Sequence, residues 1–174
     1  LLAGHDGFAG EMGHIIIETE GRECNCGKKG CLEMYVSAKG ITETVIDLQK
    51  EFPDDPLINS LIDDASQNGE LGYIDGRILD IAFDEKNETA YKIYSYTAEK
   101  LGLGLAQVAT LLEPEAFIFY GGVSKAGNRM LDDAERALNN NLMSFQKGKI
   151  KLLLSGLPPG DAGILGAASL VFYK

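Results

Sequence analysis

Residues 11–33 hold the densest group of chemically reactive side chains in this sequence of 174 residues. All three cysteines lie there, together with one of the two histidines. These four potential metal ligands are His14, Cys24, Cys26 and Cys31. Zn²⁺ prefers four tetrahedral ligands, and thiolate and imidazole are groups that suit it well. The pattern therefore predicts a structural zinc knuckle, in which Gly27 and Gly30 allow the loop to turn back around the ion.

The spacing disfavours two other interpretations of the cysteines. One is a disulfide with a free thiol, but Cys24 and Cys26 are badly placed for a mutual bridge, and three is an odd number. No secretory segment is visible in the sequence, which also argues against a disulfide. The other is a set of three unconnected buried cysteines, which would not require such close spacing.

Several blocks of the sequence resemble the ROK family, the repressors and sugar kinases of bacteria. The most specific block covers residues 7–14 and continues at 24–33 as Cys-Asn-Cys-Gly-x-x-Gly-Cys-Leu-Glu. Glycine-rich segments at 101–106, 121–127 and 161–168 are similar to later family segments and follow in the same order. The resemblance covers nearly the whole chain. It implies an α/β fold of the actin-like ATPase type, related to ribonuclease H, with a zinc knuckle.

The resemblance implies that Glu11, His14 and Glu33 bind the hydroxyls of a pyranose. A carboxylate accepts hydrogen bonds from two adjacent hydroxyls, so a pair of glutamates can distinguish ring epimers. One ring nitrogen of His14 would ligate structural zinc while the other contacts the sugar, so the metal would orient the pocket without joining the reaction. The alternative for both glutamates is solvated surface charge. His5 has no such setting and is expected in a loop.

A glycine pair indicates where a nucleotide would bind. Gly121 and Gly122 follow a predicted strand and precede a predicted helix, whose N-terminal amides favour phosphate. By itself the pattern is also typical of an ordinary turn. The family resemblance implies that Gly121, Gly122 and Val123 line the adenine and ribose side of an ATP site, with Mg-ATP as substrate. Tyr120 stands where the family commonly has a third glycine, in a position to pack against the base.

The resemblance also implies a missing part. ROK kinases carry an Asp-x-Gly-Gly-Thr phosphate loop and a catalytic aspartate in an upstream half, and neither is found here; Asp6, Asp75 and Asp161 offer no equivalent motif. We therefore expect no catalytic residue in this chain. Residues 1–174 are expected to be a C-terminal half without the N-terminal lobe, with a zinc and sugar segment at 7–40 and a nucleotide-side segment at 88–174. Alone it should not phosphorylate sugar, because phosphoryl transfer depends on positioning by the complete cleft.

Composition and charge limit the partners of this segment. Hydrophobic residues make up 45% of the chain, and no stretch is long enough to cross a bilayer, so we expect one good core and no membrane contact. The formal net charge is −10 and the pI about 4.6, a poor match to nucleic acid. Reduced, metal-bound cysteines fit a cytoplasmic location.

The hydrophobic pattern predicts alternating strands and helices. Strands are expected at 12–19, 115–120 and 150–154, and helices at 31–39, 41–51, 57–65, 75–84, 88–112, 125–142 and 162–173. The alternation over the last part of the chain indicates a sheet covered by helices.

Three functions remain open at this point. The first is the C-terminal part of an ATP-dependent hexose kinase, with glucose as the expected sugar and the 6-hydroxyl as acceptor. The second is the sugar-sensing lobe of a transcriptional repressor, and the third is a non-catalytic sugar-binding module. The retained glycine segments and the acidic charge favour the kinase. The family resemblance further suggests a homo-oligomer.

Overall fold

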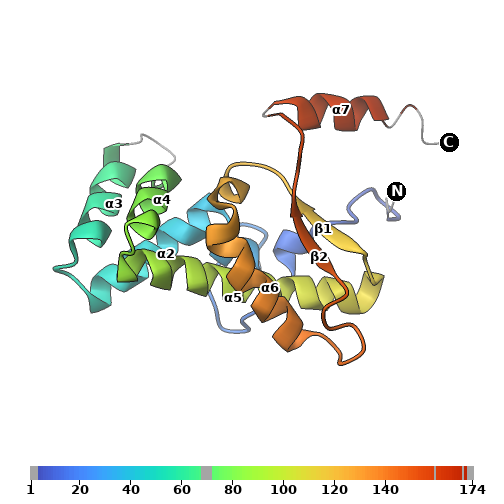
Figure 1. Cartoon of the computed structure of the whole chain (residues 1–174), viewed down its shortest axis with the longest axis horizontal. Helices are drawn as coiled ribbons and strands as arrows, with labels where there is room; N and C mark the ends of the chain where they lie inside the picture. Colours follow the sequence, from blue (N-terminus) through green and yellow to red (C-terminus); the bar gives the residue numbers. More distant parts are fainter. Residues whose placement is uncertain (1–3, 68–71, 159, 170, 172–174) are drawn as a thin grey trace.

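The computed structural model describes residues 4–67, 72–158, 160–169 and 171. Its longest helix, α5 (Glu88–Leu112), runs through the middle of the molecule (Figure 1). Asn87 starts this helix, because its side chain accepts hydrogen bonds from the N–H groups of Thr89 and Ala90. Glu113 ends it in the left-handed backbone region, with φ of 45°. The helix predicted at 88–112 is confirmed at both ends.

Helix α6 (Asn128–Asn141) packs closely along α5. Gly102 of α5 permits the close approach, since a Cβ there would lie 2.5 Å from both Ala137 Cβ and Leu138 N. Leu105 and Leu138 are buried in the main core that these two helices share. The α5–α6 pair is therefore the centre of the main core.

Four shorter helices pack around this centre. They are α1 (Glu33–Val36), α2 (Ala38–Glu51), α3 (Pro56–Gln67) and α4 (Gly76–Asp84). Figure 1 shows α2, α3 and α4 grouped at one end of α5. The predictions for 57–65 and 75–84 are confirmed to within two residues at each end.

The described residues form one small sheet of two parallel strands, β1 (Ala116–Phe119) and β2 (Lys151–Leu154). Phe117 pairs with Leu152, and both side chains pack against the main core. On the opposite face, Ile118 is 68% exposed. The fold is thus α/β, as predicted, with a sheet that the described elements cover on one face.

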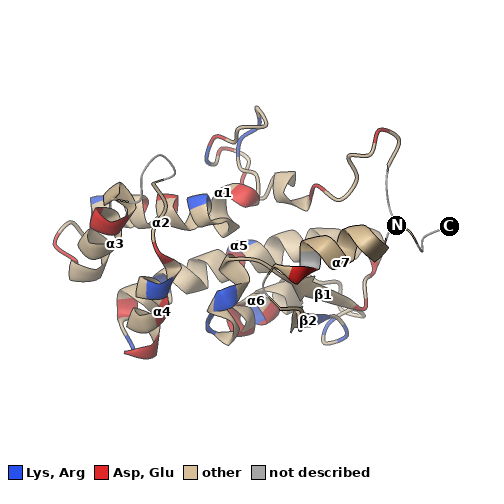
Figure 2. Ribbon diagram, turned by 90° about the horizontal axis from the view of Figure 1, so that it is seen from above, with Lys and Arg blue, Asp and Glu red and all other residues tan. Residues whose placement is uncertain are grey.

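Helix α7 (Asp161–Ser169) stands away from the rest of the molecule in Figure 1. Ile164 in this helix is 73% exposed and Leu165 is 49% exposed. Asp161 is its one charged residue, and Figure 2 draws the helix almost wholly in the colour of uncharged residues. The predicted helix at 162–173 is confirmed at its start, whereas residues 170 and 172–174 lie outside the described residues.

The strand predicted at 12–19 was wrong. The segment begins with a 3₁₀ turn, η1 (Met12–His14), and then makes a single antiparallel bridge between Ile16 and Cys31. The β-branched residues bond to the cysteine loop instead, since Ile17 N donates to Gly30 O at 2.9 Å. A local strand pattern is therefore overridden by contacts with the loop that follows it.

Two predicted helix boundaries also differ. The expected break near Gly40 lies at Ser37, whose side chain accepts a hydrogen bond from Gly40 N at 3.1 Å and caps α2. The helix predicted at 125–142 is divided into a 3₁₀ turn, η3 (Val123–Ala126), and α6, because Gly127 has φ of 58°. No helix in the described part of the chain is both long and apolar enough to cross a membrane.

Candidate functional site

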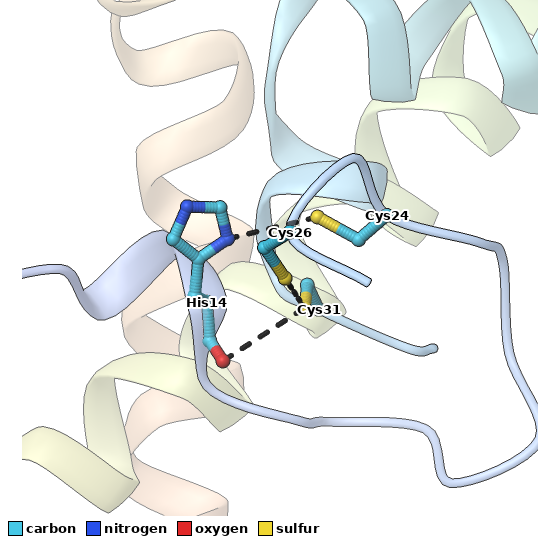
Figure 3. Close-up of side chains that lie close together, drawn as sticks. All are labelled: His14, Cys24, Cys26 and Cys31. Atoms are coloured by element: carbon cyan, nitrogen blue, oxygen red, sulfur yellow. Dashed lines mark hydrogen bonds between the residues drawn. The ribbon is translucent and has the colours of Figure 1, made fainter. Parts of the chain in front are cut away.

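The histidine and cysteine side chains of the predicted knuckle converge on one point (Figure 3). The ligand atoms of His14, Cys24, Cys26 and Cys31 all lie within 4.8 Å of one another. Cys24 Sγ is 3.6 Å from His14 Nδ1, and Cys26 Sγ is 3.6 Å from Cys31 Sγ. Cys24 and Cys31 are buried, whereas Cys26 is exposed. The sequence prediction of a single four-residue cluster therefore agrees with the geometry.

Main-chain hydrogen bonds and two glycines make the loop turn back. Cys24 N donates to Lys28 O at 2.8 Å, and Gly27 N donates to Cys24 O at 2.9 Å. Gly27 and Gly30 have φ of 86° and 73°, a backbone region that glycine adopts readily. A Cβ at Gly30 would also overlap the carbonyl oxygen of Glu18. Both glycines are therefore required by the turn, as predicted.

The donor set fits a zinc ion better than a disulfide. With Zn–S of about 2.3 Å and Zn–N of about 2.0 Å, tetrahedral ligands lie about 3.8 Å apart for two sulfurs and about 3.5 Å apart for sulfur and nitrogen. The two observed separations of 3.6 Å match these values closely. A disulfide needs sulfurs about 2.0 Å apart, and all three thiols are free. The convergence likewise disfavours three unconnected cysteines.

The cysteines differ in acidity. Burial, with the thiols of Cys26 and Cys24 beside it, raises the pKa of Cys31 to about 12. A hydrogen bond from the backbone of Lys28 lowers the pKa of Cys26. A metal cation binds thiolates, so it would have to displace the proton of Cys31, and its affinity would rise with pH.

Two of the three predicted sugar ligands lie side by side. Glu33 is the first residue of α1, and its Oε2 lies 3.6 Å from His14 Nδ1. Both side chains are partly accessible, at 48% for Glu33 and 31% for His14. Since His14 Nδ1 faces Cys24, the other ring nitrogen points away from the sulfurs (Figure 3). Glu11 lies one turn earlier: its backbone oxygen accepts a hydrogen bond from His14 N at 3.1 Å, and its side chain is exposed.

A cavity of about 440 Å³ lies between α2, α4 and the turn η3. Its apolar wall consists of Ala38, Ile41, Ile74, Leu79, Val123 and Ala126. A second hollow of about 430 Å³ is lined by the turn at Tyr120–Gly122 and by the end of β2. Gly122 and Lys125 line both hollows, so the two are adjacent. Each predicted nucleotide residue therefore lines at least one hollow: Val123 lines the larger cavity, Gly121 the second hollow, and Gly122 both.

Tyr120 contributes to the second hollow in a way that its sequence position does not indicate. Its hydroxyl oxygen accepts a hydrogen bond from Gly160 N at 2.8 Å. This contact ties the turn before α7 to the turn after β1. Tyr120 thus holds these two chain segments together.

Sequence reasoning missed the polar wall of the larger cavity. Tyr94 of α5 donates to Asp80 of α4 at 2.6 Å, and Arg129 of α6 lies 3.6 Å from the same carboxylate. Burial and the hydrogen bond to Asp80 raise the pKa of Tyr94, so the phenol stays protonated. These residues come from three helices and share no spacing pattern, so the sequence contains no local signal for them.

The three aspartates without an equivalent catalytic motif, Asp75, Asp6 and Asp161, lie respectively at a helix cap, in an exposed loop and at a helix start. Asp75 caps α4 by accepting a hydrogen bond from Arg77 N at 2.9 Å. Asp6 lies 2.8 Å from His5 Nδ1 on an exposed segment, which agrees with the loop expected for His5. Asp161 begins α7.

Comparisons with known proteins agree with this geometry. The ROK family matches residues 1–174, the whole of this sequence, and the chain therefore belongs to the ROK family. It is 31% identical to the glucokinase of Halalkalibacterium halodurans over 172 residues, which cover 98% of this chain and 50% of that protein. It is 28% identical to the xylose repressor of Caldicellulosiruptor bescii, over 98% of this chain and 41% of the repressor.

A solved structure shows the same fold. The ROK family glucokinase from Streptomyces griseus, in complex with glucose and AMPPNP, superposes with a TM-score of 0.75 at 29% identity. The match covers 97% of this chain and 53% of that one. The chain therefore has the α/β fold of the actin-like ROK sugar kinases, and it spans about half the length of the glucokinases it matches.

Proposed function

We propose that this chain is the C-terminal part of an ATP-dependent hexose kinase, with glucose as the sugar and its 6-hydroxyl as the phosphoryl acceptor. Family membership limits the choice to sugar kinases and repressors. The cavity beside Gly122 favours the kinase. A sugar sensor needs only a sugar site, whereas a hollow of about 440 Å³ with apolar and polar walls also suits a nucleoside.

The sugar site is proposed at the edge of the knuckle. Glu33 and Glu11 would accept hydrogen bonds from adjacent hydroxyls, and the outward nitrogen of His14 would contact the ring. When bound, zinc would hold the three thiolates and Nδ1 of His14, and so orient that ring. Glu33 Oε2 lies 3.6 Å from His14 Nδ1, the nitrogen proposed for zinc, so the carboxylate sits beside the imidazole ring whose other nitrogen would contact the sugar, and this adjacency supports the proposal.

The nucleotide site is proposed across the two adjacent hollows. The apolar wall near Ile41 would cover adenine, and the glycine turn at 121–122 would let the ribose and phosphates approach the backbone. Mg²⁺ would accompany ATP as part of the substrate. This chain carries a net charge of −10, so a metal-neutralised triphosphate is a better ligand than the free anion.

We further propose that residues 1–174 form the C-terminal half of a two-lobed enzyme, with the zinc and sugar segment at 7–40 and the nucleotide side at 88–174. A parallel sheet is normally covered on both faces, yet Ile118 is 68% exposed. The half-length match to the glucokinase relatives supports the same proposal. The catalytic base would lie in the other half. We also propose a cytoplasmic location, since the thiols must stay reduced to bind metal. The family resemblance supports a homo-oligomer as a further part of this proposal.

A chimeric enzyme tests the proposed function. The chain replaces the matching half of the Halalkalibacterium halodurans glucokinase, and ADP formation is measured with and without glucose. We expect glucose-dependent turnover by the chimera and none by the 174-residue chain alone. Glu33→Gln should lower kcat/KM for glucose by about a hundredfold, because a sugar hydroxyl loses a charged acceptor.

Glu23→Gln is the matched control, since Glu23 lies on the same loop and is 85% exposed. It should leave kcat/KM unchanged. A folded chimera that binds ATP but shows no glucose-dependent turnover would contradict the kinase proposal. Sugar binding without ATP binding would favour the repressor or the sugar-binding module instead.

A further inference from the structure

Arg22 links the cysteine loop to the helix corner beside it. It lies in the loop between the predicted ligands His14 and Cys24, and its side chain is only 16% exposed. One guanidinium nitrogen donates to Met34 O at 2.8 Å and to Gly40 O at 2.9 Å. These carbonyls belong to α1 and α2, so Arg22 joins both helices at their corner.

The other guanidinium nitrogen extends the contact along α2. It donates to Thr44 Oγ1 at 3.1 Å and to Asp47 Oδ2 at 2.9 Å. The guanidinium also lies over the ring of Tyr35, 4.8 Å from its centroid. Only the planar fork of arginine can make this set of contacts, because a lysine ammonium is a single point charge.

The backbone of Arg22 is held by the cysteine loop and by Tyr35 of α1. Its N–H donates to the Tyr35 hydroxyl at 3.0 Å, and its carbonyl accepts from Gly30 N at 2.8 Å. Gly30 directly precedes the ligand Cys31, and Cys24 follows Arg22 by two residues. Closure of the loop around a metal would therefore fix the position of Arg22 relative to α2.

Helix α2 in turn forms part of the larger cavity. Ile41 lines that cavity directly. Thr42 is buried, and its Oγ1 accepts a hydrogen bond from the backbone N–H of Ile74 at 3.2 Å. Ile74 lines the same cavity. Arg22 is thus hydrogen-bonded to α2 at Gly40, Thr44 and Asp47, and α2 is hydrogen-bonded through Thr42 to Ile74 in the cavity wall.

We propose that Arg22 is a positioning residue that couples metal binding at the cysteine and histidine cluster to the shape of the cavity beside α2. The proposal rests on the metal and nucleotide sites proposed above. With metal bound, Arg22 keeps its hydrogen bonds to the α1–α2 corner, and Thr42 keeps its hydrogen bond to Ile74. Without metal, the loop no longer fixes the guanidinium, and the cavity wall loses this support. The sugar side and the nucleotide side of the lobe are then linked through one side chain.

Hydrogen exchange measured by mass spectrometry tests this link in the 174-residue chain. Zinc-free and zinc-loaded protein are compared in peptides that cover the loop, α2 and Ile74. In the unaltered chain, zinc should slow exchange at all three, by about tenfold at α2 and Ile74. In Arg22→Ala the slowing should persist in the loop but vanish at α2 and Ile74. Arg22→Lys should restore it only in part.

Two further variants keep the test decisive. Lys29→Ala is the control, because Lys29 lies on the same loop and, among the described residues, its ammonium pairs with Glu23 alone, at 3.5 Å. This variant should behave like the unaltered chain. If Arg22→Ala fails to bind zinc, Thr42→Val tests the link instead, since this variant leaves the cysteine loop intact. In Thr42→Val, the zinc-dependent slowing of hydrogen exchange should disappear at Ile74 alone. Zinc-dependent slowing at Ile74 that persists in Arg22→Ala or in Thr42→Val overturns the proposal.

Nucleotide binding provides a separate readout. A fluorescent ATP analogue should bind about tenfold more tightly to the zinc-loaded chain than to the zinc-free chain, and equally to both forms of Arg22→Ala. Absence of nucleotide binding in every variant would overturn the proposed nucleotide site, while the exchange data would still decide the role of Arg22.

Discussion

Gly27→Ala and Gly30→Ala should weaken zinc binding to different extents, because Gly27→Ala adds backbone strain alone and Gly30→Ala adds a steric overlap as well. Both residues have positive φ, at 86° for Gly27 and 73° for Gly30. That backbone costs alanine about 1–2 kcal/mol. At Gly27 this is the whole cost, because a Cβ would meet nothing within 4 Å. At Gly30 the Cβ would overlap the carbonyl oxygen of Glu18, so the loop must move.

The movement at Gly30 breaks two main-chain hydrogen bonds. Ile17 N donates to Gly30 O at 2.9 Å, and Gly30 N donates to Arg22 O at 2.8 Å. Each bond contributes about 0.5–1.5 kcal/mol, so the total cost of Gly30→Ala is about 2–5 kcal/mol. We expect the loop to close fully only around the metal, so this strain opposes metal binding. We therefore expect the zinc Kd to rise about 5–30-fold in Gly27→Ala, and from about 30-fold to several thousandfold in Gly30→Ala.

Competition between each variant and a chromophoric chelator measures these zinc affinities directly. Far-ultraviolet circular dichroism of the same samples checks that the helices remain intact. Equal zinc affinities for the two variants would refute the reasoning, because only Gly30 combines the backbone strain with a steric overlap.

Two further predictions concern packing and pH. Gly102→Ala should lower Tm by about 4–8 °C, since its Cβ would lie 2.5 Å from Leu138 N and the net overpacking cost is about 2 kcal/mol. Gly166→Ala, with nothing within 4 Å, should not lower Tm, and equal losses in both variants would refute the close packing. Burial raises the pKa of Asp55, but hydrogen bonds from Thr89 and from the start of α3 outweigh it and hold that pKa below its usual 3.8. Asp55 therefore adds stability above that value, and the contribution is lost as pH falls through the lower folded pKa. Asp55→Asn should lower the free energy of unfolding by about 1 kcal/mol at neutral pH and by less in acid. Urea unfolding of both proteins at several pH values measures this, and a difference in free energy that does not change with pH would refute the prediction.

The long helix and the convergence of His14 with the three cysteines could be predicted because their signals are local. Asn87 provides a cap immediately before the apolar periodicity of α5, and Glu113 follows its last turn. The cluster uses residue types that are rare in this chain and close in sequence, so His14 and the cysteines could be assigned without tertiary information.

Other features depend on contacts that sequence patterns do not contain. The run at Ile15–Ile17 is typical of a strand, but the cysteine loop takes its hydrogen bonds. Gly40 was expected to divide two helices; it instead lies inside α2, where a Cβ would come within 2.6 Å of Tyr35 N. Both errors arise because packing with a neighbouring segment outweighs local preference.

The cavity wall and Arg22 could not be predicted for a related reason. Tyr94 and Asp80 are 14 residues apart on different helices and meet only when α4 packs on α5. Arg22 has no distinguishing neighbours in the sequence, and its partners lie 12 to 25 residues further along the chain. The contacts of Arg22 also depend on the α1–α2 corner, which the sequence pattern predicted at Gly40 and the structure places at Ser37.

Zinc K-edge X-ray absorption, with metal content measured on the same purified chain, tests most directly whether the cluster of His14 and three cysteines is a zinc site. We predict one zinc ion per chain with three sulfur ligands at about 2.3 Å and one nitrogen at about 2.0 Å. A chain that retains no zinc when zinc is supplied, or a zinc shell dominated by oxygen, would contradict the proposal that a metal organises this sugar site.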